Sequence, residues 1–289
     1  MPQQVLKYLF LLLSLALAAQ AQTAEPRGLL WEITAPGMAT SYLFGTIHSE
    51  DERVLALPSQ VATALRASPT FVMELVPDSA AAEQMGRRMV LPDGQRLASL
   101  LEPELYTQLL HTVAEYGLPA ESAERLKPWA LVMIFTMPKP RSGLFLDQLL
   151  HDMAVRQGKV VVGIESADEQ IEALDGLSMA MQIELLRHTL EQYQELPALT
   201  EALIDAWLER DLDTLQRLGD RSNATLPAAL EQALQTRLVD ERNTRMAQRL
   251  VPLLKQGGVF VAVGALHLPG EQGLIALLRE RGFTLRPRY

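Results

Sequence analysis

One short pattern occurs near both ends of the sequence: YLFGTIH at residues 42–48 and FVAVGALH at residues 260–267. In each copy an apolar run with β-branched or aromatic side chains, typical of a buried strand, leads into Gly-x-x-His. The two histidines are His48 and His267, and the chain contains only five histidines in all. A single Gly-x-x-His arises often by chance, whereas two copies that both follow predicted strands favour a shared site.

Two further predicted strands end in a carboxylate, at Glu74 in FVME and at Glu165 in VVGIE. Ligands of a largely parallel sheet bind at the carboxyl ends of its strands. Four such strands would bring two imidazoles and two carboxylates together, and this donor set suits zinc, manganese or cobalt. Taken alone, each carboxylate has a simpler interpretation as a helix N-cap or a solvated turn residue.

The glycine of each motif, Gly45 or Gly264, lies three residues before its histidine. Glycine allows the backbone to turn sharply or to approach a substrate closely. We therefore expect both glycines to shape the site rather than to supply chemistry.

Hydrophobic runs predict an α/β fold with a mostly parallel central sheet and an α-rich periphery. The predicted strands are Leu29–Thr34, Ser41–Thr46, Thr70–Leu75, Lys159–Ile164 and Val259–Val263, with an edge strand at Thr284–Pro287. The turn residues Ala35 to Gly37 make the first two strands an N-terminal hairpin. Helices are predicted at Ser59–Ala67, Leu144–Gln157 and Ala167–Leu174. The last of these begins with a capping box made by Ser166 and Glu169.

The mature chain, residues 22–289, is expected to form a single domain. Its α/β core would comprise residues 27–78, 143–175 and 239–289. Two stretches rich in Leu, Ala, Met and Glu, about 79–140 and 177–238, are predicted as large helical insertions.

Residues 1–21 have the pattern of a secretory signal peptide. The cation Lys7 precedes an apolar run at 8–18, and Ala19-Gln20-Ala21 offers a small-x-small cleavage site. The run is shorter than the roughly 20 residues that a membrane span needs. We expect cleavage after Ala21, a periplasmic or secreted protein and no stable membrane span afterwards; the alternative is an uncleaved N-terminal anchor.

Composition narrows the available chemistry. The absence of cysteine excludes disulfides, thiolate metal sites and a thiol nucleophile. The net charge of −9 argues against a nucleic-acid partner. The sequence contains no His-Glu-x-x-His, no Gly-x-Ser-x-Gly and no phosphate-binding glycine loop. Histidines, carboxylates, hydroxyls, lysines and arginines remain as the groups for catalysis.

Together these motifs carry a family resemblance. WEI at 31–33, YLFGTIH, LP at 57–58 and FVME resemble the start of the TraB/GumN family, which is related to the Tiki metalloproteases. The match continues in order through residues 143–147, GIE at 163–165 with EQ at 169–170, ERN at 241–243 and VAVGALHLPG at 261–270.

The resemblance implies a metal-dependent hydrolase site. His48 and His267 would be metal ligands, and Glu74 and Glu165 would be a further ligand and the general base, in either order. Arg242 with Asn243 would orient substrate or stabilise developing negative charge, and Asp147 is either an acidic site residue or the partner of a ligand imidazole.

Two functions follow from this assignment. The first is an exported hydrolase that uses a divalent metal, zinc, manganese or cobalt, on a peptide or small protein substrate. The alternative is a noncatalytic periplasmic binding or accessory protein for a peptide or exopolysaccharide pathway. The presence of all four strand-end residues favours the enzyme.

Overall fold

The structure, a computed structural model, describes residues 27–77, 79–139 and 142–289. The predicted signal peptide, residues 1–21, and its cleavage site lie outside the described residues. Within these residues six strands form one sheet in the order β4-β3-β5-β2-β1-β6. The strands are β1 (Leu30–Thr34), β2 (Ser41–Thr46), β3 (Thr70–Met73), β4 (Val160–Gly163), β5 (Val259–Gly264) and β6 (Thr284–Pro287).

The sheet is mostly parallel, as predicted. Strands β4, β3, β5 and β2 run parallel to one another, whereas β1 pairs antiparallel with β2 and with β6. The predicted N-terminal hairpin is therefore confirmed, and each predicted strand begins and ends within two residues of the observed one. The central strand β5 is buried over Val259–Val263, because helices cover both faces of a parallel sheet.

The α/β part of the sequence also contains helices. They are α2 (Glu52–Leu55), α3 (Ser59–Ala67), α8 (Leu146–Arg156), α9 (Ala167–Asp175), α14 (Glu241–Gln256), η5 (Ala265–His267) and α15 (Leu274–Glu280). Of these, α9 packs its apolar side chains with the helices of the two insertions rather than on the sheet. The predicted capping box of α9 is present: the Glu169 backbone N–H donates to Ser166 Oγ, and the Ser166 N–H donates to Glu169 Oε2.

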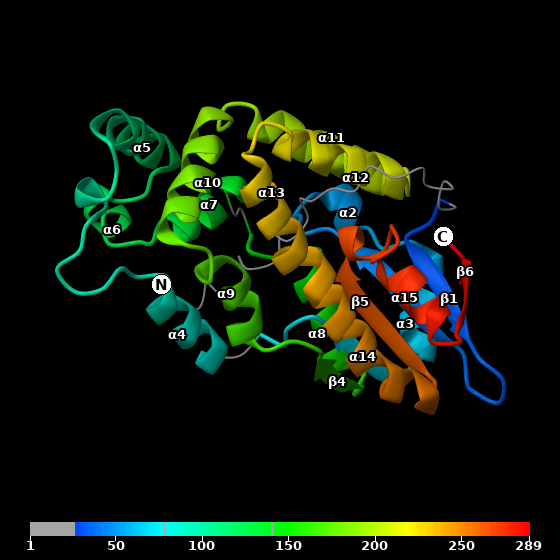
Figure 1. The fold of residues 1–289 in the computed structure, drawn as a ribbon. Helices are drawn as coiled ribbons and strands as arrows, with labels where there is room; N and C mark the ends of the chain where they lie inside the picture. Colours follow the sequence, from blue (N-terminus) through cyan, green and yellow to red (C-terminus); the bar gives the residue numbers. More distant parts are fainter. Residues whose placement is uncertain (1–26, 78, 140–141) are drawn as a thin grey trace.

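Both predicted insertions are helical, with breaks between short helices. The first contains α4 (Ser79–Arg88), η3 (Leu97–Ser99), α5 (Pro103–Tyr116), α6 (Ala120–Ala123) and α7 (Pro128–Thr136). The second contains α10 (Met179–Glu191), α11 (Leu196–Leu208), α12 (Leu212–Asn223), α13 (Ala228–Leu234) and the π-helix η4 (Gln235–Asp240). Figure 1 shows α5, α6, α7 and α10 together at one end of the molecule and the sheet at the other. None of the helices in the described parts of the chain has the length and apolar character to cross a membrane.

The buried apolar side chains form two clusters. The sheet core contains residues such as Phe44, Phe260 and Met246, and the helical core contains residues such as Trp129 and Leu131. Different helices and strands supply the two clusters. A chain segment that passes from one cluster to the other therefore crosses the boundary between them.

Two acidic residues lie at such crossings. Met73 belongs to the sheet core and Leu75 to the helical core, so Glu74 lies between them. Glu165 stands in the same way between Ile164 and Ala167. Buried charged side chains therefore lie at this boundary, and they form the candidate site.

Candidate functional site

A buried guanidinium lies at the centre of the site. Arg242, in the first turn of α14, is fully buried. Its Nε lies 2.8 Å from Glu165 Oε1, and its Nη2 lies 2.5 Å from Glu165 Oε2 and 2.7 Å from Glu74 Oε2. One arginine thus donates to both predicted site carboxylates, and it forms a fork with Glu165.

Charge pairing holds Arg242 protonated despite its burial. Burial by itself lowers the pKa of Arg242, but the negative charges of Glu165 and Glu74 outweigh this effect and raise it above its ordinary value. Gln170, on α9, adds an N–H within 3.1 Å of Glu165 Oε2 and 3.4 Å of Glu74 Oε2. The guanidinium of Arg242 and the amide N–H of Gln170 therefore both stabilise the negative charges of the two carboxylates.

His267 joins this cluster with a defined tautomer. Asn243 Nδ2 donates to the Gln272 carbonyl, so its Oδ1 is the atom that lies 2.6 Å from His267 Nδ1. Because a carbonyl oxygen only accepts, Nδ1 carries the proton and Nε2 carries the lone pair. This Nε2 lies 3.2 Å from Arg242 Nη1 and 3.8 Å from Glu74 Oε1. Burial and the neighbouring Arg242 lower the pKa of His267 to about 3, so the imidazole is neutral at neutral pH.

His48 belongs to a second group, at the end of β2. Its Nδ1 lies 3.4 Å from Asp147 Oδ2, while Asp147 Oδ1 accepts the Thr46 hydroxyl at 2.7 Å. The imidazole also stacks on Phe145, with ring centroids 3.8 Å apart and planes 15° apart. The hydrogen bond to Asp147 assigns the proton to Nδ1 and the lone pair to Nε2, and Phe145 limits the rotation of the ring.

The two motif glycines have different roles. A Cβ at Gly45 would lie 3.0 Å from the Ala265 Cα, so this glycine permits β2 to pack closely against η5. The Gly264 N–H donates to Glu74 Oε1 at 2.7 Å, and a Cβ there would make ordinary contacts of 3.5 Å. With φ of −52°, Gly264 does not adopt the left-handed backbone that a sharp glycine turn requires.

The nine predicted residues thus fall into two adjoining groups. The first contains Glu74, Glu165, Arg242, Asn243, His267 and Gly264, and the second contains His48, Asp147 and the strand that carries Gly45. His48, Asp147, Glu74 and Gly264 all line one cavity, which is where the two groups meet. Two contributors have no sequence prediction: Gln170, which follows Glu165 by five residues, and Phe145, two residues before Asp147.

A divalent metal fits these residues in donor chemistry, although they are not already arranged around one. Both imidazoles have Nδ1 held by an oxygen acceptor and Nε2 as the nitrogen with the lone pair, which is the arrangement of metal-binding histidines. Across residues 27–77, 79–139 and 142–289, no three His, Asp or Glu side chains are grouped closely enough to hold a metal ion. The guanidinium of Arg242 takes the position between the two carboxylates instead.

Comparison with known proteins shows what the chain is similar to. Zebrafish (Danio rerio) metalloprotease TIKI2 is 28% identical over 89% of this chain and 60% of its own length, and zebrafish metalloprotease TIKI1 is 30% identical over 85% and 60%. The uncharacterized protein YbaP of Escherichia coli (strain K12) is 26% identical over 86% of this chain and 91% of its own length. The chain therefore spans about 60% of the length of the Tiki relatives.

No solved structure matches the chain significantly. The model of the TraB/PrgY/gumN family matches residues 29–287, a range that contains every predicted site residue. By this match, and with the paired Gly-x-x-His strands meeting at one cavity, the chain belongs to the TraB/PrgY/gumN family.

Proposed function

We propose that this protein is an exported, metal-dependent hydrolase that cleaves peptide bonds. The observation that carries the proposal is the matched hydrogen bonding of His48 and His267, whose Nδ1 atoms lie against Asp147 and Asn243, with His48 and Glu74 lining one cavity. The relatives named metalloproteases support the reaction class. The leader pattern of residues 1–21 supports export.

His48 and His267, through Nε2, and Glu74, through Oε1, would hold the cation. When bound, a divalent cation lowers the pKa of a coordinated water towards about 7 and so supplies a nucleophile at neutral pH. His267 needs no deprotonation to act as a ligand, because its low pKa keeps it neutral throughout the physiological range.

The structure supports different roles for the two glutamates. Glu74 lines the cavity, and its Oε1 accepts a single described hydrogen bond, from the Gly264 N–H. The Glu165 side chain is fully buried, and both of its oxygens accept from Arg242. We assign Glu74 as the carboxylate that meets metal or substrate and Glu165 as the residue that positions Arg242.

Arg242 and Asn243 act through other residues in this proposal. Arg242 is fully buried and holds Glu74 in place. Its Nη1 also donates to His267 Nε2, and this hydrogen bond would have to open for Nε2 to hold a cation. Asn243 fixes the tautomer of His267. Both are positioning residues, and stabilisation of negative charge on the substrate would come from the cation.

Metal content and peptide cleavage test the proposal together. The protein, purified without chelator, is assayed by mass spectrometry for bound zinc, manganese and cobalt, and with each metal against a quenched-fluorescence peptide library. His48→Ala and His267→Ala should each lower metal content, and Glu74→Gln should lower cleavage at least about 100-fold. His111→Ala is the matched control, since His111 is exposed on α5.

The outcomes separate the two functions. Metal that binds without cleavage of any library peptide would support the noncatalytic accessory role instead. Equal metal content in wild type, His48→Ala and His267→Ala would overturn the metal site itself.

A further inference from the structure

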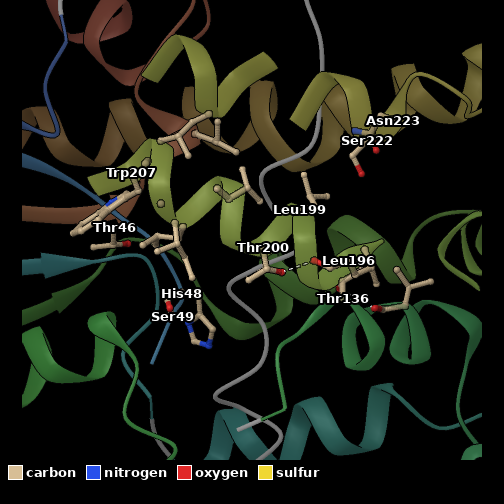
Figure 2. Close-up of a pocket in the computed structure, with 18 of the residues that line it drawn as sticks. Thr46, His48, Ser49, Thr136, Leu196, Leu199, Thr200, Trp207, Ser222 and Asn223 are labelled. Carbon is tan, nitrogen blue, oxygen red and sulfur yellow. Dashed lines mark hydrogen bonds between the residues drawn. The ribbon is translucent and has the colours of Figure 1, made fainter. Parts of the chain in front are cut away.

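A cavity of about 110 Å³ lies against the candidate site, at the boundary between the two cores. Its walls come from the sheet core at Ile204 and Trp207 and from the helical core at Val132 and Leu185. Figure 2 shows His48 and Trp207 on one side of the cavity and Thr136 and Asn223 on the other, with Leu196 and Leu199 of α11 between them. The cavity therefore extends from His48 along the boundary between the sheet core and the helical core.

The chemistry of the walls is apolar. Leu196 and Leu199 are half-buried, and they belong to neither core, so their side chains serve the cavity rather than the packing of a cluster. Among the described residues that line it there is no Lys or Arg, and the acids Glu74 and Asp147 stand at the end next to His48. A charged group that entered beyond this end would lose its hydration without gaining a partner of opposite charge.

One part of the wall is polar but neutral. His188 Nε2 lies 2.9 Å from Thr225 Oγ1 and 3.0 Å from Gln192 Nε2. Burial lowers the pKa of His188, so the imidazole is uncharged at neutral pH. His188 lines the cavity, and Glu184, one turn earlier on α10, pairs with Arg187.

The size of the cavity limits its occupant. A cavity of about 150 Å³ lined by aliphatic and aromatic side chains is large enough to hold a benzene molecule. At about 110 Å³ this cavity is somewhat smaller, so its size is of the order of one aliphatic or aromatic side chain rather than of an extended peptide segment.

We propose that this cavity is the specificity subsite of the enzyme, and that it binds one large uncharged apolar side chain, leucine or phenylalanine, next to the scissile bond. The inference rests on the proposed peptidase function, because it assigns the substrate class of the same site. Its support is the continuity of the cavity with His48 and Glu74, together with the mostly apolar lining, which contains no Lys or Arg among the described residues.

Matched substrates and a cavity-filling variant test the subsite. Quenched-fluorescence peptides that carry Phe, Leu, Gly or Asp at one position are compared by kcat/KM, and the varied position is moved in turn to each site around the cleaved bond. We expect the Phe or Leu peptide to exceed the Asp peptide at least about 100-fold at one position. Leu199→Trp should lower cleavage of the Phe peptide about 10-fold or more and affect the Gly peptide little. The control is Val155→Trp, at a side chain 54% exposed on α8.

Leu199→Ala guards against a folding defect in the tryptophan variant. It enlarges the cavity and should shift the preference towards a Trp peptide, whereas a merely destabilised enzyme would lose all substrates in parallel. Parallel losses in both variants, or no preference among the four peptides, would overturn the subsite.

A binding measurement separates failure of the subsite from failure of the proposed function. N-acetyl-phenylalaninamide and N-acetyl-aspartamide are titrated into the protein while the Trp207 indole resonance is followed by NMR. Binding of the phenylalanine probe, abolished by Leu199→Trp, supports the subsite even when no peptide is cleaved, and then the hydrolase proposal alone fails. Cleavage without probe binding or side-chain preference refutes the subsite and leaves the hydrolase proposal standing.

Discussion

Replacement of Arg242 by methionine should reveal how strongly the buried cluster depends on its single guanidinium. The substitution keeps most of the aliphatic stem and removes three donor contacts to carboxylate oxygens, at 2.5 to 2.8 Å. Hydrogen bonds to charged groups contribute about 1.5–3 kcal/mol each, so the three set an upper limit of about 4.5–9 kcal/mol. Relaxation reduces this, and breaking a buried ion pair typically costs about 3–5 kcal/mol. We expect a loss of about 3–5 kcal/mol in the free energy of unfolding at pH 7.

The matched control lies on the same helix. Arg249 also forms a fork with a carboxylate, with Nη1 and Nη2 at 2.8 and 2.6 Å from the Glu169 oxygens, but its side chain is 43% exposed. Exposed pairs contribute about 0–1 kcal/mol because water screens the charges. Arg249→Met should therefore cost several kcal/mol less than Arg242→Met, although the hydrogen-bond geometry is alike.

Urea unfolding followed by far-UV circular dichroism measures both variants, with equal m-values as the condition for comparison. The double variant Arg242→Met/Glu165→Gln should recover part of the loss at pH 7, because it removes one of the two carboxylates left without their cation. A cost below about 1 kcal/mol for Arg242→Met, or a cost that Glu165→Gln does not reduce, would refute the role given to the cluster.

Further predictions concern the histidines and glycines. In the folded protein the pKa of His267 is lowered from 6.5 to about 3, so its contribution to stability is present above pH 6.5 and is lost as the pH falls towards 3, by about 1.4 kcal/mol per pH unit. His267→Gln should therefore make the free energy of unfolding less dependent on pH between 6.5 and 5. Parallel curves for the wild type and the variant would contradict the assignment. Gly45→Ala should displace η5 and lower both the thermal midpoint and metal affinity, whereas Gly264→Ala, whose Cβ contacts are ordinary, should leave the midpoint within about 2 °C in a thermal scan. Asp147→Asn should weaken metal binding by His48 about 10–100-fold in calorimetric titration, because the amide can donate to Nδ1 and reverse the tautomer; unchanged affinity would exclude that role.

The strands could be predicted because the signal for each is local. Val259–Val263 is a β-branched and aromatic run buried on both faces, and its boundaries follow from the run itself. The same holds for the capping box at Ser166 and Glu169, which is complete within four residues. The meeting of β2 with β5 also follows from pattern, since both carry Gly-x-x-His at the same end of parallel strands.

The arrangement inside the site could not be predicted in this way. Arg242 meets Glu165 across 77 residues and Glu74 across 168, and the electrostatic preference that places a cation between two acids has no sequence period. A metal and a guanidinium satisfy the same pair of carboxylates, so the residue types alone did not distinguish them. The stacking of Phe145 on His48 depends on how α8 docks and is likewise a tertiary contact.

The π-helix η4 makes the orientation of Arg242 tolerant of one extra residue in the chain. η4 runs over Gln235–Asp240 and passes directly into α14, whose second residue is Arg242. Each residue of an α-helix turns the chain by about 100°, and a π-turn accommodates one more residue per turn than an α-turn. Deletion of one residue within η4 would let the segment relax to a regular α-helix that turns through nearly the same total angle, so α13 and α14 should keep their relative orientation. The π-helix therefore absorbs one extra residue while Arg242 still faces the carboxylates and α13 still faces the helical core.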